Sequence, residues 1–164
     1  MLIILGGLPG AGKSTIAREL ARRIGAMHLR IDSIEQAIRD SDLLKGPMND
    51  VGYRVAYAVA EDNLRLGRVV IADSVNPIQF TREAWRSVAA RANVRALEVE
   101  IRCADSVEHR SRVEKRIGDI AGLRLPTWKE VVAREYAPWD QEHLVLDTSA
   151  LLPEECVEMI QKAM

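Results

Sequence analysis

Residues 7–14 read Gly-Leu-Pro-Gly-Ala-Gly-Lys-Ser, which fits the pattern G-x-x-x-x-G-K-S/T at every fixed position. An apolar run over residues 2–5 precedes this stretch, as a strand should, and apolar side chains recur at helical spacing over residues 16–24. A strand, a glycine-rich loop and a helix in this order bring backbone N–H groups and the positive end of a helix together. The stretch therefore predicts a binding site for the phosphates of a nucleoside triphosphate.

The residues of this motif have expected contacts with Mg·ATP. Backbone N–H groups from Gly10 to Thr15 should donate hydrogen bonds to the phosphates. Lys13 should reach the β- and γ-phosphates, and the Ser14 hydroxyl should bind Mg²⁺. The full set of expected nucleotide contacts in the motif is Gly7, Leu8, Pro9, Gly10, Ala11, Gly12, Lys13, Ser14 and Thr15.

The overall composition is that of an ordinary globular protein. Of the 164 residues, 48% are hydrophobic and 29% are charged, and the formal net charge is −1. This length predicts one domain over residues 1–164, and the charge balance argues against strong attraction to long nucleic acids or anionic membranes. No apolar stretch reaches the length of a membrane span, and the chain opens onto a strand with no room for a signal peptide. We therefore expect a cytoplasmic enzyme.

Strand-like and helix-like segments alternate along the chain. Strands are predicted over residues 2–5, 26–31, 68–73, 94–101 and 144–146. Helices are predicted over residues 16–24, 32–40, 51–66, 76–91, 105–117 and 127–137 and from residue 153 onwards, with a loop over residues 41–50. This alternation predicts the α/β class, with a five-stranded parallel sheet covered by helices on both faces.

Two of the predicted strands differ in pattern. Residues 69–72 are continuously apolar, which is typical of a parallel strand covered on both faces. Residues 94–101 alternate instead, because Glu98 and Glu100 stand between apolar neighbours. The alternation predicts a half-exposed strand near an edge of the sheet.

The remaining sequence separates the classes of protein that share this loop. The G-x-G-x-x-G spacing of dinucleotide-binding folds is absent, and so is the Asn-Lys-x-Asp guanine motif. Asp119 imitates the start of a D-x-x-G motif, but it lies in a basic region rather than at a strand end. Asp73 is followed by Ser74, whereas motor-type ATPases carry Asp-Glu at this place. The chain resembles the small P-loop kinases: the branch of gluconate kinase, adenylylsulfate kinase, chloramphenicol phosphotransferase, zeta-toxin-like kinases and phage polynucleotide kinase.

The resemblance covers essentially the whole chain and is carried by the loop, by residues 30–33 and by residues 69–73. It implies an AAA-type ATP-binding kinase with the P-loop NTPase fold and a mobile basic lid, approximately residues 105–137. It also implies transfer of the γ-phosphoryl group of Mg·ATP to a hydroxyl group. The implied cofactors are ATP and Mg²⁺.

Asp32 is the candidate catalytic base. In the related kinases an Asp just past the second strand accepts the proton of the attacking hydroxyl, and Asp32 lies at that place. Phosphoryl transfer asks for little more than one group that orients this hydroxyl. The alternative is that Asp32 only caps the next helix, with Glu35 completing a capping box.

Asp73 and Asn76 follow the buried strand that should neighbour the loop strand. Asp73 is expected to bind Mg²⁺ through water or to hold the acceptor hydroxyl. Asn76 is a candidate substrate contact, although Asn before Pro77 is also a good helix cap.

Other side chains are weaker candidates for binding the acceptor. Arg39 is included in the substrate-binding set with Asp32, Asp73 and Asn76, and Arg54 and Arg82 belong to segments that should border the same crevice. Each of these three arginines is also explained as a solvated surface charge. His28 has no partner at recognisable spacing and is predicted to pack within its strand.

The densest positive charge lies over residues 109–116. Arg112 and Arg116 are four residues apart, so on one helix they would share a face and clamp the β- and γ-phosphates as catalytic groups beside Lys13. Arg110 is a candidate for stacking on adenine. Ion pairs within the helix, Glu108 with Arg112 and Arg110 with Glu114, explain part of this pattern equally well.

The sequence therefore predicts an ATP-dependent kinase that acts on a hydroxyl group of a small molecule. One alternative is a 5′-hydroxyl polynucleotide kinase, in which nucleic acid is the partner through its 5′ end. Another is a non-catalytic module that responds to bound nucleotide. An Asp32→Asn substitution distinguishes them, because only a kinase needs this carboxylate for transfer.

Overall fold

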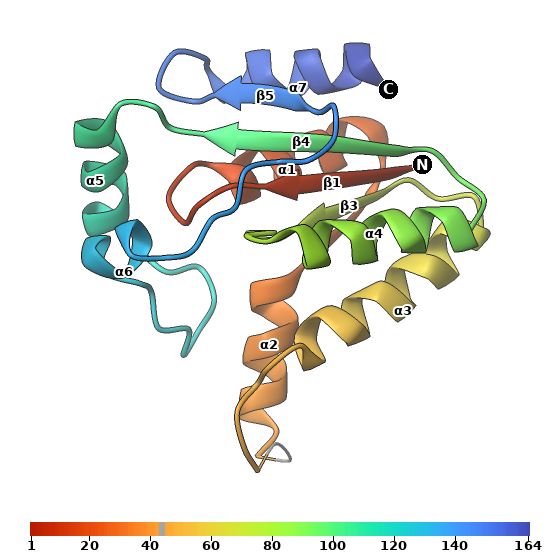
Figure 1. Ribbon diagram of the computed structural model, residues 1–164, viewed down its shortest axis with the longest axis horizontal. Helices are drawn as coiled ribbons and strands as arrows, with labels where there is room; N and C mark the ends of the chain where they lie inside the picture. Colours follow the sequence, from red (N-terminus) through yellow and green to blue (C-terminus); the bar gives the residue numbers. More distant parts are fainter. Residues whose placement is uncertain (43–44) are drawn as a thin grey trace.

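Five parallel strands form a single sheet in the order β2-β3-β1-β4-β5 (Figure 1). The structure is a computed structural model that describes residues 1–42 and 45–164, so part of the predicted loop over residues 41–50 lies outside the described residues. The strands are β1 (Leu2–Gly6), β2 (Met27–Arg30), β3 (Val70–Asp73), β4 (Ala96–Arg102) and β5 (Leu144–Asp147). The five-stranded parallel sheet of the sequence prediction is confirmed.

Helices cover both faces of the sheet, as predicted. Alternate side chains of β1 point to opposite faces, so Ile3 and Leu5 pack with helices α1 (Lys13–Ile24) and α7 (Pro153–Ala163). Leu2 and Ile4 pack on the other face with α3 (Val51–Arg65) and α4 (Gln79–Arg91). The remaining helices are α2 (Ile31–Asp40), α5 (Ser106–Lys115) and α6 (Trp128–Val132). Because both faces are covered, β1 is fully buried and its glycine-rich end is held in place.

Strand β4 lies next to the edge strand β5, so the prediction that it runs near an edge is confirmed, but the prediction that it is half exposed is wrong. Its two glutamates are buried rather than solvated. Glu98 accepts a hydrogen bond of 3.1 Å from Arg86 on α4, and Glu100 lies 3.3 Å from Nε2 of His143. These partners lie 12 and 43 residues away along the chain, and they pair with carboxylates that the alternating pattern places on a covered face.

Several helices begin or end away from their predicted bounds, α1 among them, which begins at Lys13 rather than residue 16. α2 begins at Ile31 with Arg30 at the N-cap, so Asp32 lies inside the first turn and does not cap it. α4 begins at Gln79, because Asn76 adopts a left-handed conformation and turns its side chain to the carbonyl of Leu5. α5 ends at Lys115.

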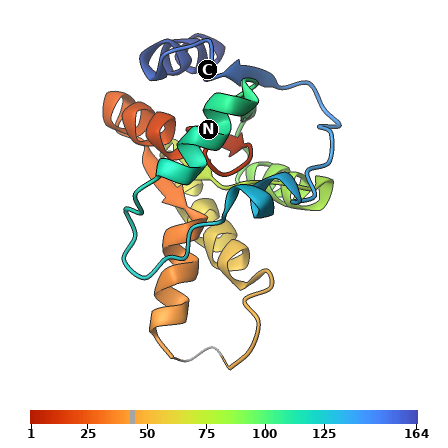
Figure 2. The same ribbon diagram turned by 90° about the vertical axis from the view of Figure 1, so that its left-hand side faces the viewer.

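Helix α6 begins as predicted and ends early. The capping box of Thr127 and Glu130 is present, but the helix stops at Val132 rather than Ala137. α5 and α6, with the segments around them, lie beyond the carboxyl ends of the strands, and α5 lies in front of the loop that follows β1 (Figure 2). We call residues 105–137 the α5–α6 segment.

Candidate active site

A cavity of about 700 Å³ opens at the carboxyl ends of the strands. It is bounded by the glycine-rich loop, the ends of β2 and β3, the α5–α6 segment and the turn after β5. The predicted site residues that line it are Pro9, Gly10, Gly12, Lys13, Ser14, Thr15, Asp32, Asp73, Arg112 and Arg116. Gly7, Leu8 and Ala11 instead line a second cavity, of about 390 Å³.

The backbone of the glycine-rich loop has the left-handed conformations that its sequence requires. Gly10 has φ 86° and Gly12 has φ 97°, a region that side chains other than glycine rarely adopt. A Cβ atom on Gly10 would also lie 2.5 Å from the Val113 side chain of α5. Gly12 is the N-cap of α1 and provides no capping side chain, so no such side chain competes with an anion for the first N–H groups of this helix, although the N–H of Thr15 already donates to the carbonyl of Gly12 at 3.1 Å.

Lys13 brings a buried positive charge to the mouth of this loop. Its Nζ donates a hydrogen bond of 3.0 Å to the carbonyl of Leu8. Burial lowers the pKa of Lys13 to about 8, against the opposing influence of the Asp73 and Asp32 carboxylates. An anion such as a polyphosphate would compensate this desolvated charge.

Asp73, at the end of β3, has partners that the sequence did not reveal. Its Oδ2 lies 3.0 Å from Nε2 of His28 on β2, so the prediction that His28 has no partner is wrong. Burial alone would raise the pKa of Asp73, but hydrogen bonds from His28 and Ser14 and the charge of Lys13 lower it. Asp73 is therefore held as a carboxylate beside the Ser14 hydroxyl.

This pair of oxygen donors suits Mg²⁺, which prefers hard oxygen ligands and keeps several of its waters. Within the part of the chain that the structure describes, no three His, Cys, Asp or Glu side chains gather as a metal cage. A magnesium ion at Ser14 and Asp73 would take its remaining ligands from phosphate oxygens and water.

Asp32 offers an accessible carboxylate on the same side of the cavity. Its side chain is 48% exposed and its Oδ2 lies 3.8 Å from Nη2 of Arg30. β2 and β3 are neighbours in the sheet, so Asp32 and Asp73 follow adjacent strand ends. A carboxylate at this place is able to accept a proton from a hydroxyl group in the cavity.

The basic side chains in and just after α5 do not share one face of the helix. Arg112 donates hydrogen bonds of 2.8 Å to the hydroxyl and the carbonyl of Thr148 and one of 2.5 Å to Glu108. Arg116 follows the end of the helix with extended backbone, so the predicted shared face is wrong although both arginines line the cavity. Arg110 pairs with Glu114 at 2.8 Å and does not line the cavity.

The structure does not bring the other candidate side chains to the cavity. Arg39 pairs with Glu35 at 3.1 Å, and Arg54 is exposed on α3. Asn76 is fully buried beneath the loop. Arg82 is also fully buried, which corrects its interpretation as a surface charge or an acceptor contact.

Among the cavity residues that the sequence prediction missed are Arg18, Arg30, Asp119 and Arg134. Asp119 accepts a hydrogen bond of 2.6 Å from Arg18 and two, of 2.8 and 3.1 Å, from Arg30. These hydrogen bonds, chiefly from Arg30, lower the pKa of Asp119 far below its usual value. The position of Arg30, at a strand end just before Asp32, was a signal that could have predicted it as a site residue. For Asp119 there was none, because no local pattern joins it to residues about a hundred positions away.

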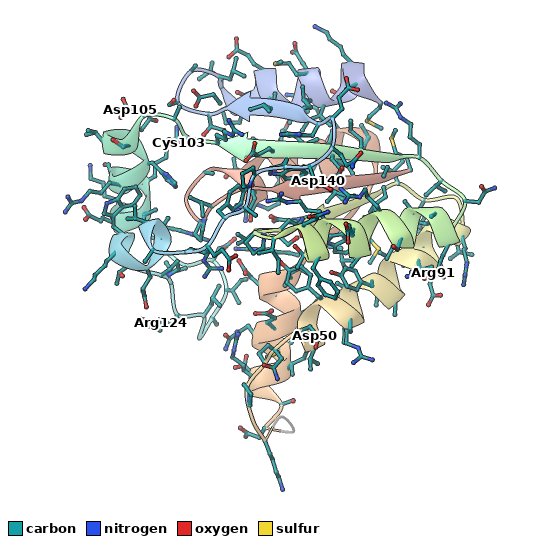
Figure 3. The ribbon with its side chains drawn as sticks, in the orientation of Figure 1. Asp50, Arg91, Cys103, Asp105, Arg124 and Asp140 are labelled. Atoms are coloured by element: carbon teal, nitrogen blue, oxygen red, sulfur yellow. The ribbon has the colours of Figure 1, made fainter. Side chains whose placement is uncertain are left out.

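None of the helices in the described ranges has the length and apolarity to cross a membrane. Cys103 and Asp105 mark the turn by which the chain leaves β4 and enters α5 (Figure 3).

Comparisons with known proteins agree with this architecture. The uncharacterized protein Rv2004c of Mycobacterium tuberculosis is 30% identical over 157 residues, which cover 88% of this chain and 31% of that protein. The chain thus spans about a third of the length of the curated relatives that it matches.

Two solved structures show the same fold at low sequence identity. The APS kinase CysC of Mycobacterium tuberculosis, in complex with AMPPNP and APS, has a TM-score of 0.72 and 19% identity, covering 98% of this chain and 95% of that one. A gluconokinase from Sinorhizobium meliloti has a TM-score of 0.64 and 17% identity, covering 95% and 86% of the two chains.

The family model named AAA domain matches residues 2–134, which include the glycine-rich loop, Asp32, Asp73 and most of the α5–α6 segment. A P-loop domain of this kind implies nucleotide binding. The chain belongs to the AAA domain family, and it shares its fold with these two kinases.

Proposed function

We propose that this protein is a kinase that transfers the γ-phosphoryl group of ATP to a hydroxyl group of a small molecule. One observation carries the proposal: a glycine-rich loop with a buried lysine and an exposed carboxylate, Asp32, line the same cavity. A nucleotide-dependent switch would need the loop alone, whereas transfer to an alcohol also needs a group that orients the alcohol.

The chain's own residues divide the work of the reaction. The N–H groups of the loop and the Lys13 ammonium hold the phosphates, and Ser14 with Asp73 would hold Mg²⁺. A bound magnesium ion would neutralise charge on the transferring group. Asp32 accepts the proton of the acceptor hydroxyl as its oxygen bonds to the γ-phosphorus, while the bond to the β,γ-bridging oxygen breaks and ADP leaves.

The α5–α6 segment is suited to act as a lid. It contributes Arg112, Arg116, Asp119 and Arg134 to the cavity lining, and it reaches across the glycine-rich loop (Figure 2). Closure over bound substrates would exclude water, which limits wasteful hydrolysis of ATP.

The comparisons support ATP and a small acceptor. The APS kinase was solved with AMPPNP and APS, and the gluconokinase is named for a small hydroxy acid. Both are similar in fold to this chain over nearly its whole length, which favours the same type of reaction with an acceptor of its own.

The test is a screen for ATP consumption against hydroxyl-bearing metabolites and a 5′-hydroxyl oligonucleotide, beside a control without acceptor. With a productive acceptor, Asp32→Asn should lower kcat by roughly 10²- to 10⁴-fold and leave ATP affinity nearly unchanged. Asp40→Asn is the matched control, because Asp40 lies on the same helix and does not line the cavity. Unchanged transfer in Asp32→Asn, or no binding of Mg·ATP to the folded protein, would contradict the proposal.

A further inference from the structure

The side chain of Asp119 enters the cavity as an internal ligand for two arginines. Asp119 belongs to the α5–α6 segment, whereas Arg18 lies on α1 and Arg30 at the end of β2. Arg30 donates from both Nη1 and Nη2 to the two carboxylate oxygens, at 2.8 and 3.1 Å, and Arg18 adds a third hydrogen bond of 2.6 Å. This forked arrangement is the one that arginines use for carboxylates, phosphates and sulfates in general.

We propose that Arg18 and Arg30 form a binding site for an oxyanion group on the acceptor, and that the Asp119 carboxylate occupies this site until the acceptor displaces it. The inference rests on the proposed kinase function, because it names the class of molecule that is phosphorylated. That class is a hydroxyl compound carrying a sulfate, phosphate or carboxylate group.

The position of the two arginines fits this role. Nη2 of Arg30 lies 3.8 Å from Oδ2 of Asp32, and Arg18, Arg30, Asp32 and Asp119 all line one cavity. An oxyanion held by the arginine pair would therefore bring the rest of a small acceptor within reach of the Asp32 carboxylate. Binding at this place anchors the acceptor and leaves its hydroxyl free to be oriented.

Arg30 also has one N–H group that the bonds to Asp119 do not use. The residue is only 8% exposed, and its Nε has no hydrogen-bond partner among the residues that the structure describes. A buried N–H group without an acceptor is costly, and the two oxygens of Asp119 are already used by the Nη atoms. A tetrahedral oxyanion has a further oxygen to offer, so the site should prefer sulfate or phosphate to a carboxylate.

The charges of the cavity residues also favour an anionic group on the acceptor. In the present arrangement Asp119 and Asp32 together balance Arg18 and Arg30, and withdrawal of Asp119 leaves the cavity with an excess of positive charge. Arg134 lines the same cavity and has neither an ion pair nor a side-chain hydrogen bond within residues 1–42 and 45–164. The acceptor end of the cavity is therefore complementary to an anion.

An external anion that displaces Asp119 has to replace its hydrogen bonds from the buried Arg30, whereas the pair of Asp119 with Arg18 is already weakened by solvent. The side chains of Arg18 and Asp119 are 44% and 37% exposed, so water screens their pair. Because Asp119 is part of the proposed lid, an acceptor that takes its place also changes how the lid is attached to α1 and β2. Acceptor binding and lid position are thereby coupled.

The test uses sulfate as the probe, with the protein saturated with Mg·AMPPNP so that the glycine-rich loop and the γ-phosphate position are filled. Calorimetry measures sulfate affinity at constant ionic strength, and the arginine Nε–H signals in NMR spectra report contact with Arg30. Asp119→Asn should bind sulfate about fivefold more tightly than the natural protein, because the competing internal carboxylate is gone. Adding Arg18→Gln to this variant should remove the gain, and acetate should bind more weakly than sulfate.

Arg22→Gln is the matched control, because Arg22 is exposed on the same helix and does not line the cavity. Equal sulfate affinity in Asp119→Asn and the natural protein, or equal effects of Arg18→Gln and Arg22→Gln, would overturn the oxyanion site. Acetate binding as tightly as sulfate would overturn the preference for a tetrahedral group. If sulfate behaves as expected while no acceptor is phosphorylated, the kinase proposal fails and the oxyanion site stands.

Discussion

Nε2 of His109, in the middle of α5, lies 2.8 Å from the carbonyl oxygen of Pro9 in the glycine-rich loop. A carbonyl oxygen only accepts, so this nitrogen carries the hydrogen and the tautomer of His109 is fixed. The Trp128 ring of α6 meets the His109 ring edge to face, with centroids 5.2 Å apart. The loop is therefore shaped from outside by the α5–α6 segment as well as by its own glycines.

This contact predicts that His109 supports nucleotide binding through the loop. We expect His109→Leu, which keeps the bulk but loses the donor, to lower the free energy of unfolding by about 1 kcal/mol. Its affinity for Mg·ADP should fall as well, since the loop loses the hydrogen bond that holds the Pro9 carbonyl. His109→Gln should recover part of the unfolding free energy and part of the Mg·ADP affinity. Denaturation and calorimetry measure the two effects, with Arg110→Gln as the exposed control on the same helix. Equal losses in the Leu and Gln variants would show that the hydrogen bond is irrelevant.

Lys13 predicts an unusual dependence of stability on pH. Its pKa is about 8 in the folded protein, whereas its usual value, which we take for the unfolded chain, is 10.5. Between pH 8 and 10.5 the unfolded chain therefore binds more protons at this residue than the folded protein does. Stability contributed by this residue therefore rises with pH from about 8 to 10.5, and below pH 8 the buried charge costs folding energy in full. We expect Lys13→Met to stabilise the nucleotide-free protein by about 1–3 kcal/mol at pH 7 while abolishing tight binding of Mg·ATP.

The measurement is urea denaturation of both proteins at several pH values from 7 to 10.5. The advantage of Lys13→Met should shrink steadily across the upper part of this range. A difference that stays constant with pH would mean that the charge of Lys13 is not what destabilises the fold.

The sequence predicted those parts of the structure whose causes are local. The glycine-rich motif, the apolar run of β1 and the capping box of Thr127 and Glu130 each depend on neighbours a few residues away, and all are present. Asp32 was placed at the end of the second strand by the same kind of reasoning, and it lines the cavity. Short-range patterns carry this information because hydrogen bonding and side-chain periodicity are set within a few residues.

Residues whose environment depends on distant partners were misinterpreted. Glu100 was assigned to an exposed pattern, yet it is only 2% exposed because His143 and its other partners cover it. Arg82 was assigned to the surface for the same reason: a charged residue is usually solvated, and nothing nearby in the sequence announces its buried acceptors. The bridge from Asp119 to Arg30 joins positions 89 residues apart, so only the folded chain reveals it.

Arg82 predicts a stability effect that no surface arginine would give. It donates to the carbonyls of Asn76, Pro77, Ala137 and Pro138, at 3.0, 3.3, 2.7 and 2.7 Å, and its guanidinium lies 4.4 Å from the centre of the Trp139 ring. Arg82→Met would remove the donor from the carbonyls of Asn76, Ala137 and Pro138, while Pro77 keeps the N–H of Ala137 at 2.8 Å, and it should destabilise the protein by about 2–5 kcal/mol. Arg82→Lys should recover only part of this, because one ammonium cannot reach all four acceptors.

The control for this experiment is Arg91→Met, at the far end of the same helix (Figure 3). Arg91 is exposed and pairs with Glu61 on the surface, so its loss should be far smaller. Equal denaturation midpoints for the two variants would show that the buried carbonyls do not depend on Arg82.

Arg112 and Arg116 predict different kinetic effects although both line the cavity. Arg112 is held by Thr148 and Glu108, whereas Arg116 has no ion pair or side-chain hydrogen bond in the described part of the chain. The positive charge of Arg116 also helps to lower the pKa of Lys13, so Arg116 lies on the side of the cavity where the proposed phosphate site is. We therefore expect Arg116→Ala to lower kcat by roughly 10²-fold or more with little loss of ADP affinity, because an arginine that no structural partner holds is free to follow charge that develops during transfer. Arg112→Ala should weaken ADP binding and lower kcat by similar factors, since it disturbs the turn at Thr148.

Steady-state kinetics and ADP calorimetry on both variants give the comparison. Equal losses of kcat and ADP affinity in Arg116→Ala would reduce the role of Arg116 to ground-state binding.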